Sequence, residues 1–329
     1  MLEMLELIHR LRRNRRNSTI RNLLQETHIH PQHLVWPVFV LEGKNKKEPI
    51  PTMPGIYRWS LDLLIPELKR ASKLGLNSIA LFPFIEVHLK DASGTYAINK
   101  DNLVTKAIQE IKNSCPGICL FSDLALDPFT THGHDGLLDP KTGDVQNDPT
   151  VAVLTQMAVL HALAGADYVA PSDMMDGRVG AIRKTLDQNG FSQTGIMAYS
   201  AKYASAFYGP FREAVGSKQL QGDKKSYQLS IHNTREALRE VEADIWEGAD
   251  IVMVKPALSY LDIISQLRQK YSVPIASYNV SGEYAMVKAA AQQGWVDEKK
   301  MVNEILISLR RGGSDLIFTY HAMDYVQWF

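Results

Sequence analysis

One stretch of fifteen residues, SDLALDPFTTHGHDG from Ser122 to Gly136, is crowded with side chains that carry out chemistry. It holds three aspartates and two histidines, namely Asp123, Asp127, His132, His134 and Asp135. Carboxylates and imidazoles ligate metal ions, and the same groups serve as general acids and bases. The stretch alone therefore leaves both a metal site and an acid/base site open.

Two lysines lie where an amine is able to act as a nucleophile. Lys255, in IVMVKPALSY, follows four apolar residues, and Lys202 lies in AYSAKYASAFYGPFR. Burial and a neighbouring cation both disfavour the charged form of an amine, so a lysine at the mouth of a dry interior can be neutral near pH 7. Taken singly, Lys255 also fits a snorkelling side chain and Lys202 a solvated loop residue. Together they predict Schiff-base chemistry on a carbonyl substrate.

The elements that position these residues follow from a regular alternation along the chain. Short apolar runs rich in β-branched and aromatic residues alternate with longer segments of helical period. The eight runs are VWPVFV, SIALFPF, ICLFSDLAL, DYVAPSD, GIMAYS, DIVMVKP, PIASYNV and DLIFTYH. Strands that are apolar on both faces indicate a parallel sheet, and eight strand–helix units predict an α/β fold, the closed (β/α)8 TIM barrel. A doubly wound open sheet is the alternative, but no G-x-G-x-x-G follows the first run.

The barrel prediction places catalytic groups at the carboxyl ends of the strands, where the loops form the active face. Polar residues occur at these ends in six of the runs: Asp123 and Asp127, Ser172, Lys202, Lys255, Ser281, and Tyr320 within the eighth run. Any strand must eventually become polar, so a single such residue means little. Their coincidence across six strands favours a common site.

The length and composition are typical of one globular protein. The 329 residues are 45% hydrophobic and 22% charged with a net charge of zero, which gives no overall attraction to nucleic acid or to an anionic membrane. The apolar runs are too short to span a membrane and the N-terminus lacks the order of a signal peptide, so we expect a cytoplasmic protein. The two cysteines, Cys115 and Cys119, are too few for a disulfide framework or a thiolate zinc site.

Several motifs together resemble one enzyme family. MVKPA, SAKYASAFYGPFR, DLALDPFTTHGHDG, APSDMMDGRVGAIR, GDKKSYQL and NVSGEYAM occur in the order found in porphobilinogen synthases, also called 5-aminolevulinate dehydratases. The resemblance extends from about Pro37 to Tyr320. It implies a lyase of tetrapyrrole (haem) biosynthesis that condenses two molecules of 5-aminolevulinate to porphobilinogen with loss of two waters.

The resemblance also implies roles for individual residues. Lys255 corresponds to the Schiff-base lysine for the substrate that becomes the propionate-bearing half, and Lys202 to the lysine for the other substrate. The residues expected to bind substrate are Arg212, Lys224, Ser281, Tyr320, Asp123, Ser172, Tyr208 and Tyr278. Lys224 stands where the family pattern has an arginine, so its carboxylate contact loses the bidentate fork.

The metal dependence implied by the resemblance is that of the zinc-independent branch. Three cysteines of the zinc-dependent branch are replaced here by Ala125, Asp127 and Asp135. Oxygen ligands suit Mg²⁺ rather than zinc, so no zinc is expected. The resemblance further implies an allosteric Mg²⁺ at Glu240, although the dense charges of TREALREVEADIWEGAD also fit a solvated helix face.

Residues 1–30 precede the first strand, and the barrel domain is expected over 31–329. The stretch carries an apolar stripe in MLEMLELIHRL and six arginines, which suits a short helix lying on a neighbouring subunit. The absence of aromatic residues there disfavours a nucleic-acid arm. The resemblance implies that this arm builds a homo-octamer.

Two other classes of function remain open at this stage. A Schiff-base aldolase on the same barrel would also use a lysine on the sixth strand, but no glycine-rich phosphate loop follows strands seven and eight. A non-enzymatic assembly protein is supported by the arm alone.

Overall fold

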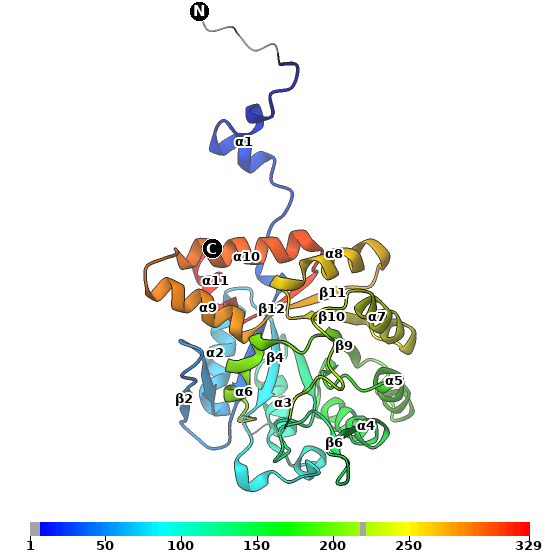
Figure 1. Ribbon diagram of the computed structural model, residues 1–329. Coiled ribbons are helices and arrows are strands. Elements are labelled where there is room, and N and C mark those ends of the chain that lie inside the picture. The colour runs from blue at the N-terminus through cyan, green and yellow to red at the C-terminus, as the bar shows by residue number, and fades with distance from the viewer. Residues whose placement is uncertain (1–6, 218–221) are drawn as a thin grey trace, which may run out of the picture.

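The computed structural model describes residues 7–217 and 222–329, and its centre is a closed barrel of eight parallel strands (Figure 1). Each strand pairs with its neighbours in the order β12-β11-β10-β9-β8-β5-β4-β1, and β12 pairs with β1 to close the cylinder. The strands are β1 (Leu34–Val40), β4 (Ser78–Pro83), β5 (Cys119–Leu124), β8 (Tyr168–Pro171), β9 (Gly195–Lys202), β10 (Ile251–Lys255), β11 (Ile275–Asn279) and β12 (Leu316–Thr319). All eight predicted strands and the TIM-barrel fold are thus confirmed.

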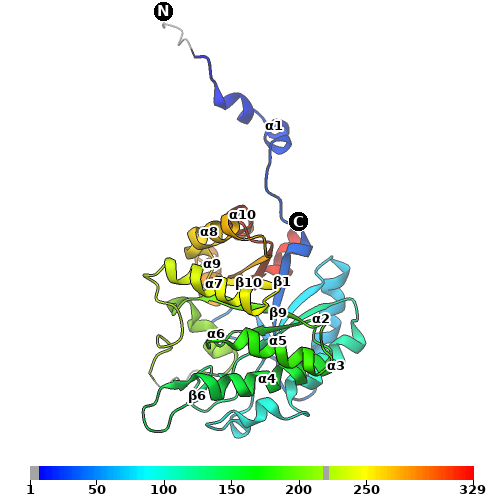
Figure 2. The same cartoon turned by 90° about the vertical axis from the view of Figure 1, so that its right-hand side faces the viewer.

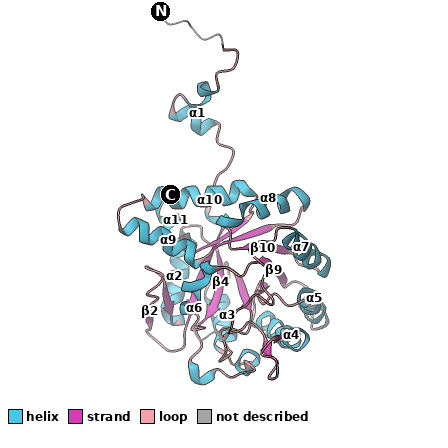
Figure 3. Cartoon of the chain, in the orientation of Figure 1, coloured by secondary structure: helices cyan, strands magenta, loops and turns pink. Residues whose placement is uncertain are grey.

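Helices lie around the outside of the barrel, as the view turned by 90° and the view coloured by secondary structure show (Figures 2 and 3). They are α2 (Leu61–Lys73), α3 (Leu103–Ser114), α4 (Asn147–Ala164), α5 (Arg178–Gln188), α6 (Gly209–Ala214), α7 (Arg235–Glu247), α8 (Leu261–Lys270), α9 (Ser281–Gln292), α10 (Glu298–Gly312) and α11 (Ala322–Trp328). Two short pairs of strands lie outside the barrel, β2 (Lys47–Pro49) with β3 (Tyr57–Trp59) and β6 (Leu137–Leu138) with β7 (Val145–Gln146).

The strands are apolar on both faces because each face packs against a different core. Residues such as Val252 and Val254 of β10 belong to the cluster shared with the surrounding helices. The intervening Ile251 and Met253 belong to a second cluster inside the barrel, which is rich in aromatic rings. Lys255 continues the inward-facing series at the carboxyl end of β10, so its amine reaches the barrel mouth.

Strand β9 departs from this simple alternation. Between the pairs Val252↔Ala198 and Val254↔Ala201 it contains one residue more than β10, which is a β-bulge. Beyond the bulge Lys202 stands directly opposite Lys255. The predicted run GIMAYS ends before Lys202, but in the structure the strand extends to Lys202, which is its last residue.

The N-terminal segment extends away from the barrel in both views (Figures 1 and 2). The predicted helix in MLEMLELIHRL is wrong for residues 7–10, which have no helical structure, and Met1, Leu2 and Leu5 of its stripe lie outside the described residues. Helical turns occur instead at Leu11–Arg15 and Ser18–Leu23, where the side chain of Asn17 caps the second of them by accepting from the Ile20 N–H at 2.9 Å. The stripe alone does not specify a helix there because so short a helix is marginal without a packing surface.

Among the described residues no helix combines the length and the apolar character that crossing a membrane requires. Cys115 is buried, Cys119 is partly buried, and both are free thiols.

Candidate active site

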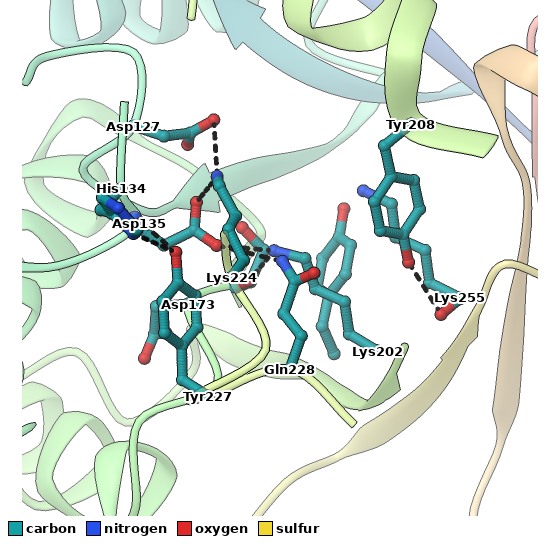
Figure 4. Close-up of polar contacts among 12 residues, drawn as sticks. Asp127, His134, Asp135, Asp173, Lys202, Tyr208, Lys224, Tyr227, Gln228 and Lys255 are labelled. Carbon is teal, nitrogen blue, oxygen red and sulfur yellow. Dashed lines mark hydrogen bonds and ion pairs between the residues drawn. The ribbon is translucent and has the colours of Figure 1, made fainter. Parts of the chain in front are cut away.

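The carboxyl ends of the strands and the following loops bring most of the predicted site residues to one cavity (Figure 4). Its lining includes Asp123, Asp127, Asp135, Ser172, Lys202, Tyr208, Phe211, Arg212, Lys224, Gln228 and Lys255. The residues come from the ends of β5, β8, β9 and β10 and from the segments that follow β5 and β9. The aspartates at the end of β5 and the two lysines therefore share one site.

Lys255 lies in an aromatic enclosure and is 5% exposed. Its Nζ lies 4.6 Å from the ring centre of Tyr278, 5.0 Å from those of Tyr199 and Phe211, and 5.3 Å from that of Tyr208. Burial and, after it, the charge of Lys202 lower the pKa of Lys255 to about 7. A substantial fraction of this amine is therefore neutral, and nucleophilic, near pH 7.

Lys202 is buried, and its ammonium donates to two acceptors. Its Nζ lies 3.1 Å from Oδ2 of Asp135 and also donates to the backbone carbonyl of Ser172. The two lysines thus differ in their surroundings, since Lys202 has a carboxylate partner and Lys255 has aromatic faces. The two amines thus stand side by side on adjacent strands in unlike surroundings.

Lys224 closes the cavity from the segment that follows α6. Its Nζ lies 2.6 Å from Oδ1 of Asp135 and 3.7 Å from Oδ2 of Asp127. Burial alone would raise the pKa of Asp135, but the charges of Lys202 and Lys224 outweigh it and hold that pKa well below its usual value. For Asp127 burial prevails over the charge of Lys224, so its pKa is raised. Asp135 therefore stays ionised, whereas the surroundings of Asp127 favour its neutral form more than solvent does.

Asp123 is the acid of the site that lies within β5 itself. Its Oδ1 is buried and finds no hydrogen-bond partner within 7–217 and 222–329. Burial and the nearby charge of Asp127 raise the pKa of Asp123 to about 7. A carboxyl with such a pKa can both accept and return a proton at neutral pH.

The remaining predicted substrate-binding residues lie beside the cavity wall. Ser281 Oγ accepts from the N–H of Phe211 at 3.0 Å and donates to the carbonyl of Phe207 at 3.3 Å. Tyr278 and Tyr320 share a hydrogen bond of 3.0 Å between their hydroxyls, and Tyr320 follows β12 rather than lying in it.

The loop before α6 rests closely on the first turn of α9. A Cβ at Gly282 would come within 2.6 Å of the carbonyl oxygen and 2.8 Å of the Cα of Phe207. Only glycine therefore allows this approach, because the opposing atoms are backbone. The contact places α6, and with it Arg212, over the mouth of the barrel.

The two histidines of the opening stretch order the loop rather than facing the lysines. His132 Nε2 bonds the carbonyl of Ala92 at 3.0 Å, and the N–H of His134 donates to His132 Nδ1 at 3.1 Å. His134 Nδ1 bonds the hydroxyl of Tyr227 at 3.1 Å, and that hydroxyl accepts from the N–H of Asp135 at 3.4 Å.

Sequence reasoning missed four residues that shape the site: Tyr199, Phe211, Tyr227 and Gln228. Gln228 donates to Oδ2 of Asp135 at 3.4 Å. Tyr227 and Gln228 follow Lys224 closely in GDKKSYQL, and that spacing was the one available signal for them. The inward direction of Tyr199 could have been read from the alternation of β9.

Glu240 lies away from this cavity, on α7. It borders a separate cavity of about 330 Å³ together with Asp176, Glu236 and Asn147. Burial raises the pKa of Glu240, and the charge of Arg178 opposes that effect. These oxygen donors suit a hard divalent cation.

A second acidic group lies outside the barrel mouth. Glu298, His321 and Asp324 are close enough together to hold an ion. The ammonium of Lys288 already bonds both carboxylates, with Nζ 2.8 Å from Oδ2 of Asp324. The group therefore carries its own internal cation.

Comparisons with known proteins point to one family. The family model of delta-aminolevulinic acid dehydratase matches residues 8–328. The chain is 53% identical over 318 residues to delta-aminolevulinic acid dehydratase of Chlamydia pneumoniae, covering 97% of this chain and 95% of that protein, and 47% identical over 320 residues to that of Bacillus subtilis, covering 97% and 98%.

A solved structure is similar over nearly the whole fold. It is delta-aminolevulinic acid dehydratase (porphobilinogen synthase) from Toxoplasma gondii ME49 in complex with the reaction product porphobilinogen, with a TM-score of 0.97 and 47% identity over 99% of this chain and 93% of that one. With a family match across the chain and relatives at this identity, the chain belongs to the delta-aminolevulinic acid dehydratase family.

Proposed function

We propose that this enzyme condenses two molecules of 5-aminolevulinate to porphobilinogen through Schiff bases on Lys255 and Lys202. The family membership supports the reaction. The observation that carries the mechanism is the placement of two buried lysines opposite each other on β9 and β10, one of them with a pKa lowered to about 7. Two keto substrates need two amine nucleophiles, and the site supplies both.

The first step is attack by the neutral amine of Lys255 on the ketone carbon of one substrate. The carbinolamine that results loses its hydroxyl as water, and the imine forms. Asp123, with a pKa raised to about 7, is the group placed to give the departing hydroxyl its proton. The aromatic enclosure of Lys255 excludes water, which favours the imine over its hydrolysis.

The second imine forms on Lys202 in the same way and releases the second water. Lys202 must first lose a proton, and Asp123, whose pKa is raised to about 7 and which is ionised once it has given up its own proton, is the carboxyl suited to take it. The chain methylene carbon of one imine loses a proton and attacks the other imine carbon, and the free amino group of the attacked substrate forms the C–N bond at the remaining imine carbon. A second proton from the attacking carbon, one from an aminomethyl carbon and one from the amino nitrogen are also lost, and these four protons allow both lysines to leave as amines. The two ketone oxygens account for the two waters lost.

Two carboxylate clamps orient the substrates in this scheme. Arg212 and Lys224 hold one carboxylate, and Ser281 and Tyr320 hold the other, with Ser172, Tyr208 and Tyr278 around the reacting groups. Lys224 is already paired with Asp135 and Asp127, so the substrate carboxylate competes with these two residues for the ammonium. A substrate carboxylate that binds at this clamp therefore replaces Asp135 or Asp127 as a partner of the Lys224 ammonium.

The carboxylates at the positions of the zinc-branch cysteines do not fit a zinc ion. Asp127 and Asp135 are oxygen donors, and the ammonium of Lys224 lies against both of them. We therefore derive no step through a metal at this place. For Mg²⁺ we propose the cavity at Glu240, where it would act from outside the reaction site.

The division of the chain and its assembly belong to the same proposal. Residues 1–30 act as an arm for subunit contacts, and 31–329 form the catalytic barrel of a cytoplasmic homo-octamer. The exposed side chains along the described part of the arm, including Ile8 at 88% and Leu11 at 76%, support a packing partner outside the protomer.

The test is reductive trapping with borohydride. Wild-type protein incubated with 5-aminolevulinate should gain substrate mass on Lys255 and Lys202, whereas a sugar phosphate, the substrate class of a Schiff-base aldolase, should give none. Lys255→Ala should lose all turnover because no covalent attachment remains on that side. Wild-type-like turnover in Lys255→Ala would overturn the proposal.

A further inference from the structure

The bulge in β9 decides which way Lys202 points. Met197 and Tyr199 belong to the cluster inside the barrel, whereas Ala198 belongs to the cluster on the helix side. Without an extra residue Lys202 would share the parity of Ala198 and face the helices. Ala201 faces the helix side and Lys202 the cavity, so the reversal lies between Tyr199 and Ala201. Bulges near active sites re-aim side chains in this manner.

A bulge leaves backbone groups without their usual partners, and here a buried arginine takes one of them. Nη2 of Arg178 donates to the carbonyl of Tyr199 at 3.3 Å. Arg178 is the first residue of α5 and is 2% exposed. It is held by Asp244 of α7 through two bonds, 2.6 Å from Nη1 to Oδ1 and 3.2 Å from Nη2 to Oδ2. The guanidinium therefore connects helix α7 to the bulge.

Arg178 also contacts Asp173, the residue that follows the Ser172 carbonyl to which Lys202 donates. Its Nε lies 3.9 Å from Oδ2 of Asp173, whose Oδ1 accepts from the N–H of Met175 at 2.7 Å. This turn contains Met174, whose φ is 69°. A residue other than glycine adopts this left-handed conformation only at a cost in free energy. The carbonyl of Ser172, immediately before the turn, accepts from the Lys202 ammonium.

The network is not arranged for stability alone. Arg178 Nε and Asp173 Oδ2 both lack a hydrogen-bond partner in the described part of the chain. An unsatisfied buried polar atom destabilises the fold, and buried charges are often no more stabilising than apolar residues. A role in fixing the bulge and the strained turn explains why the charged side chains of Arg178, Asp173 and Asp244 are buried there.

We propose that Arg178 is a positioning residue, which fixes the β9 bulge and the turn after β8 and so aims Lys202 at its substrate. The inference rests on the proposed function, because it assigns Arg178 to the Lys202 half of the reaction. Among residues 7–217 and 222–329, no hydrogen bond or ion pair joins this network to Lys255 on β10, and the link to it is the ring of Tyr199, 5.0 Å from its Nζ. Loss of Arg178 should therefore affect the two imines unequally.

The experiment compares Arg178→Met with Arg178→Lys and with a matched control, Arg183→Met. Arg183 lies on the same helix and bonds the carbonyl of Thr194 at 2.7 Å, just before β9 begins, so it braces the opposite end of the same strand. Borohydride trapping with 5-aminolevulinate, followed by peptide mapping, gives the amount of substrate on each lysine.

In Arg178→Met we expect trapping on Lys202 to fall by about tenfold or more relative to trapping on Lys255, since a displacement near 1 Å has effects of this order. Arg178→Lys keeps the cation but loses the fork, so it should restore the ratio in part. Arg183→Met should keep the wild-type ratio.

Equal loss at both lysines, or an unchanged ratio in folded Arg178→Met, would overturn the inference. If Arg178→Met is not obtained folded, Asp244→Asn weakens the same anchor with a side chain of equal size and should lower the Lys202 to Lys255 ratio in the same direction. An unchanged ratio there would be equally decisive. Failure of the proposed function itself looks different, because wild-type protein would then trap no substrate on either lysine.

Discussion

Replacing Lys255 with methionine should abolish the reaction and yet make the folded protein more stable at neutral pH. Methionine has a similar length and no charge, so it suits the enclosure of Tyr199, Tyr208, Phe211 and Tyr278. A lysine that titrates at 10.5 when exposed but at about 7 in the fold disfavours the folded state by up to about 4 kcal/mol at pH 7. Lys255→Met removes this cost to the stability of the folded state, because methionine does not ionise.

The sign follows from the direction of the shift. Between pH 7 and 10.5 the unfolded chain holds a proton on Lys255 that the folded chain has lost, so wild-type stability rises with pH in this window. The penalty is fully present below pH 7 and disappears above 10.5. The advantage of Lys255→Met should therefore shrink steadily as the pH is raised from 7 to 10.

Urea unfolding at matched protein concentration across this pH range measures the effect. Lys112→Met is the control, because Lys112 lies at the other end of the barrel in an ion pair with Asp167, 2.8 Å from Nζ to Oδ2, and should give no such gain. A variant at position 255 that is less stable than wild type at pH 7, or a difference that does not change with pH, would show that the lysine is not held neutral by its surroundings.

Three further predictions concern the other parts of the scheme. Lys202→Arg keeps a positive charge beside Asp135 but cannot form an imine, so borohydride should trap one substrate per subunit in place of two, and two would contradict the two-lysine mechanism. Zinc chelators should leave activity nearly intact, whereas Mg²⁺ should stimulate wild type and not Glu240→Gln; an enzyme that is inactivated by removal of stoichiometric zinc would contradict the metal assignment. Deleting residues 1–30 should give smaller assemblies with lower activity in light scattering, and a fully active truncated octamer would exclude the role of the arm.

The barrel and the positions of the two lysines at its mouth were accessible from sequence because both depend on local patterns. A strand buried on both faces is a continuous apolar run, and a lysine that interrupts such a run at its carboxyl end, as Lys255 does, has few places to go other than the barrel mouth. The family motifs then specified which polar residues accompany it.

The contacts that tune the site were not accessible in this way. The pairing of Lys224 with Asp135 joins residues 89 positions apart, and the enclosure of Lys255 draws rings from three separate segments. The bulge of β9 changes one step of an alternation and leaves no distinct mark in GIMAYSAK. Such features depend on tertiary register, which periodicity does not record.

The seating of the α6 loop on Ser281 has a consequence for the order of events. Ser281 Oγ now donates to the carbonyl of Phe207, so a substrate carboxylate that accepts the same hydroxyl proton replaces one of the two bonds that hold the loop and leaves only the bond from the N–H of Phe211. Arg212, which we propose binds the other substrate, follows Phe211 directly. Occupation of the clamp at Ser281 should thus loosen the loop before the second molecule enters, which makes binding sequential. Levulinate, which has the same ketone and carboxylate but no amine, should then increase proteolytic cleavage within residues 203–217, and unchanged cleavage would indicate that the two halves fill independently.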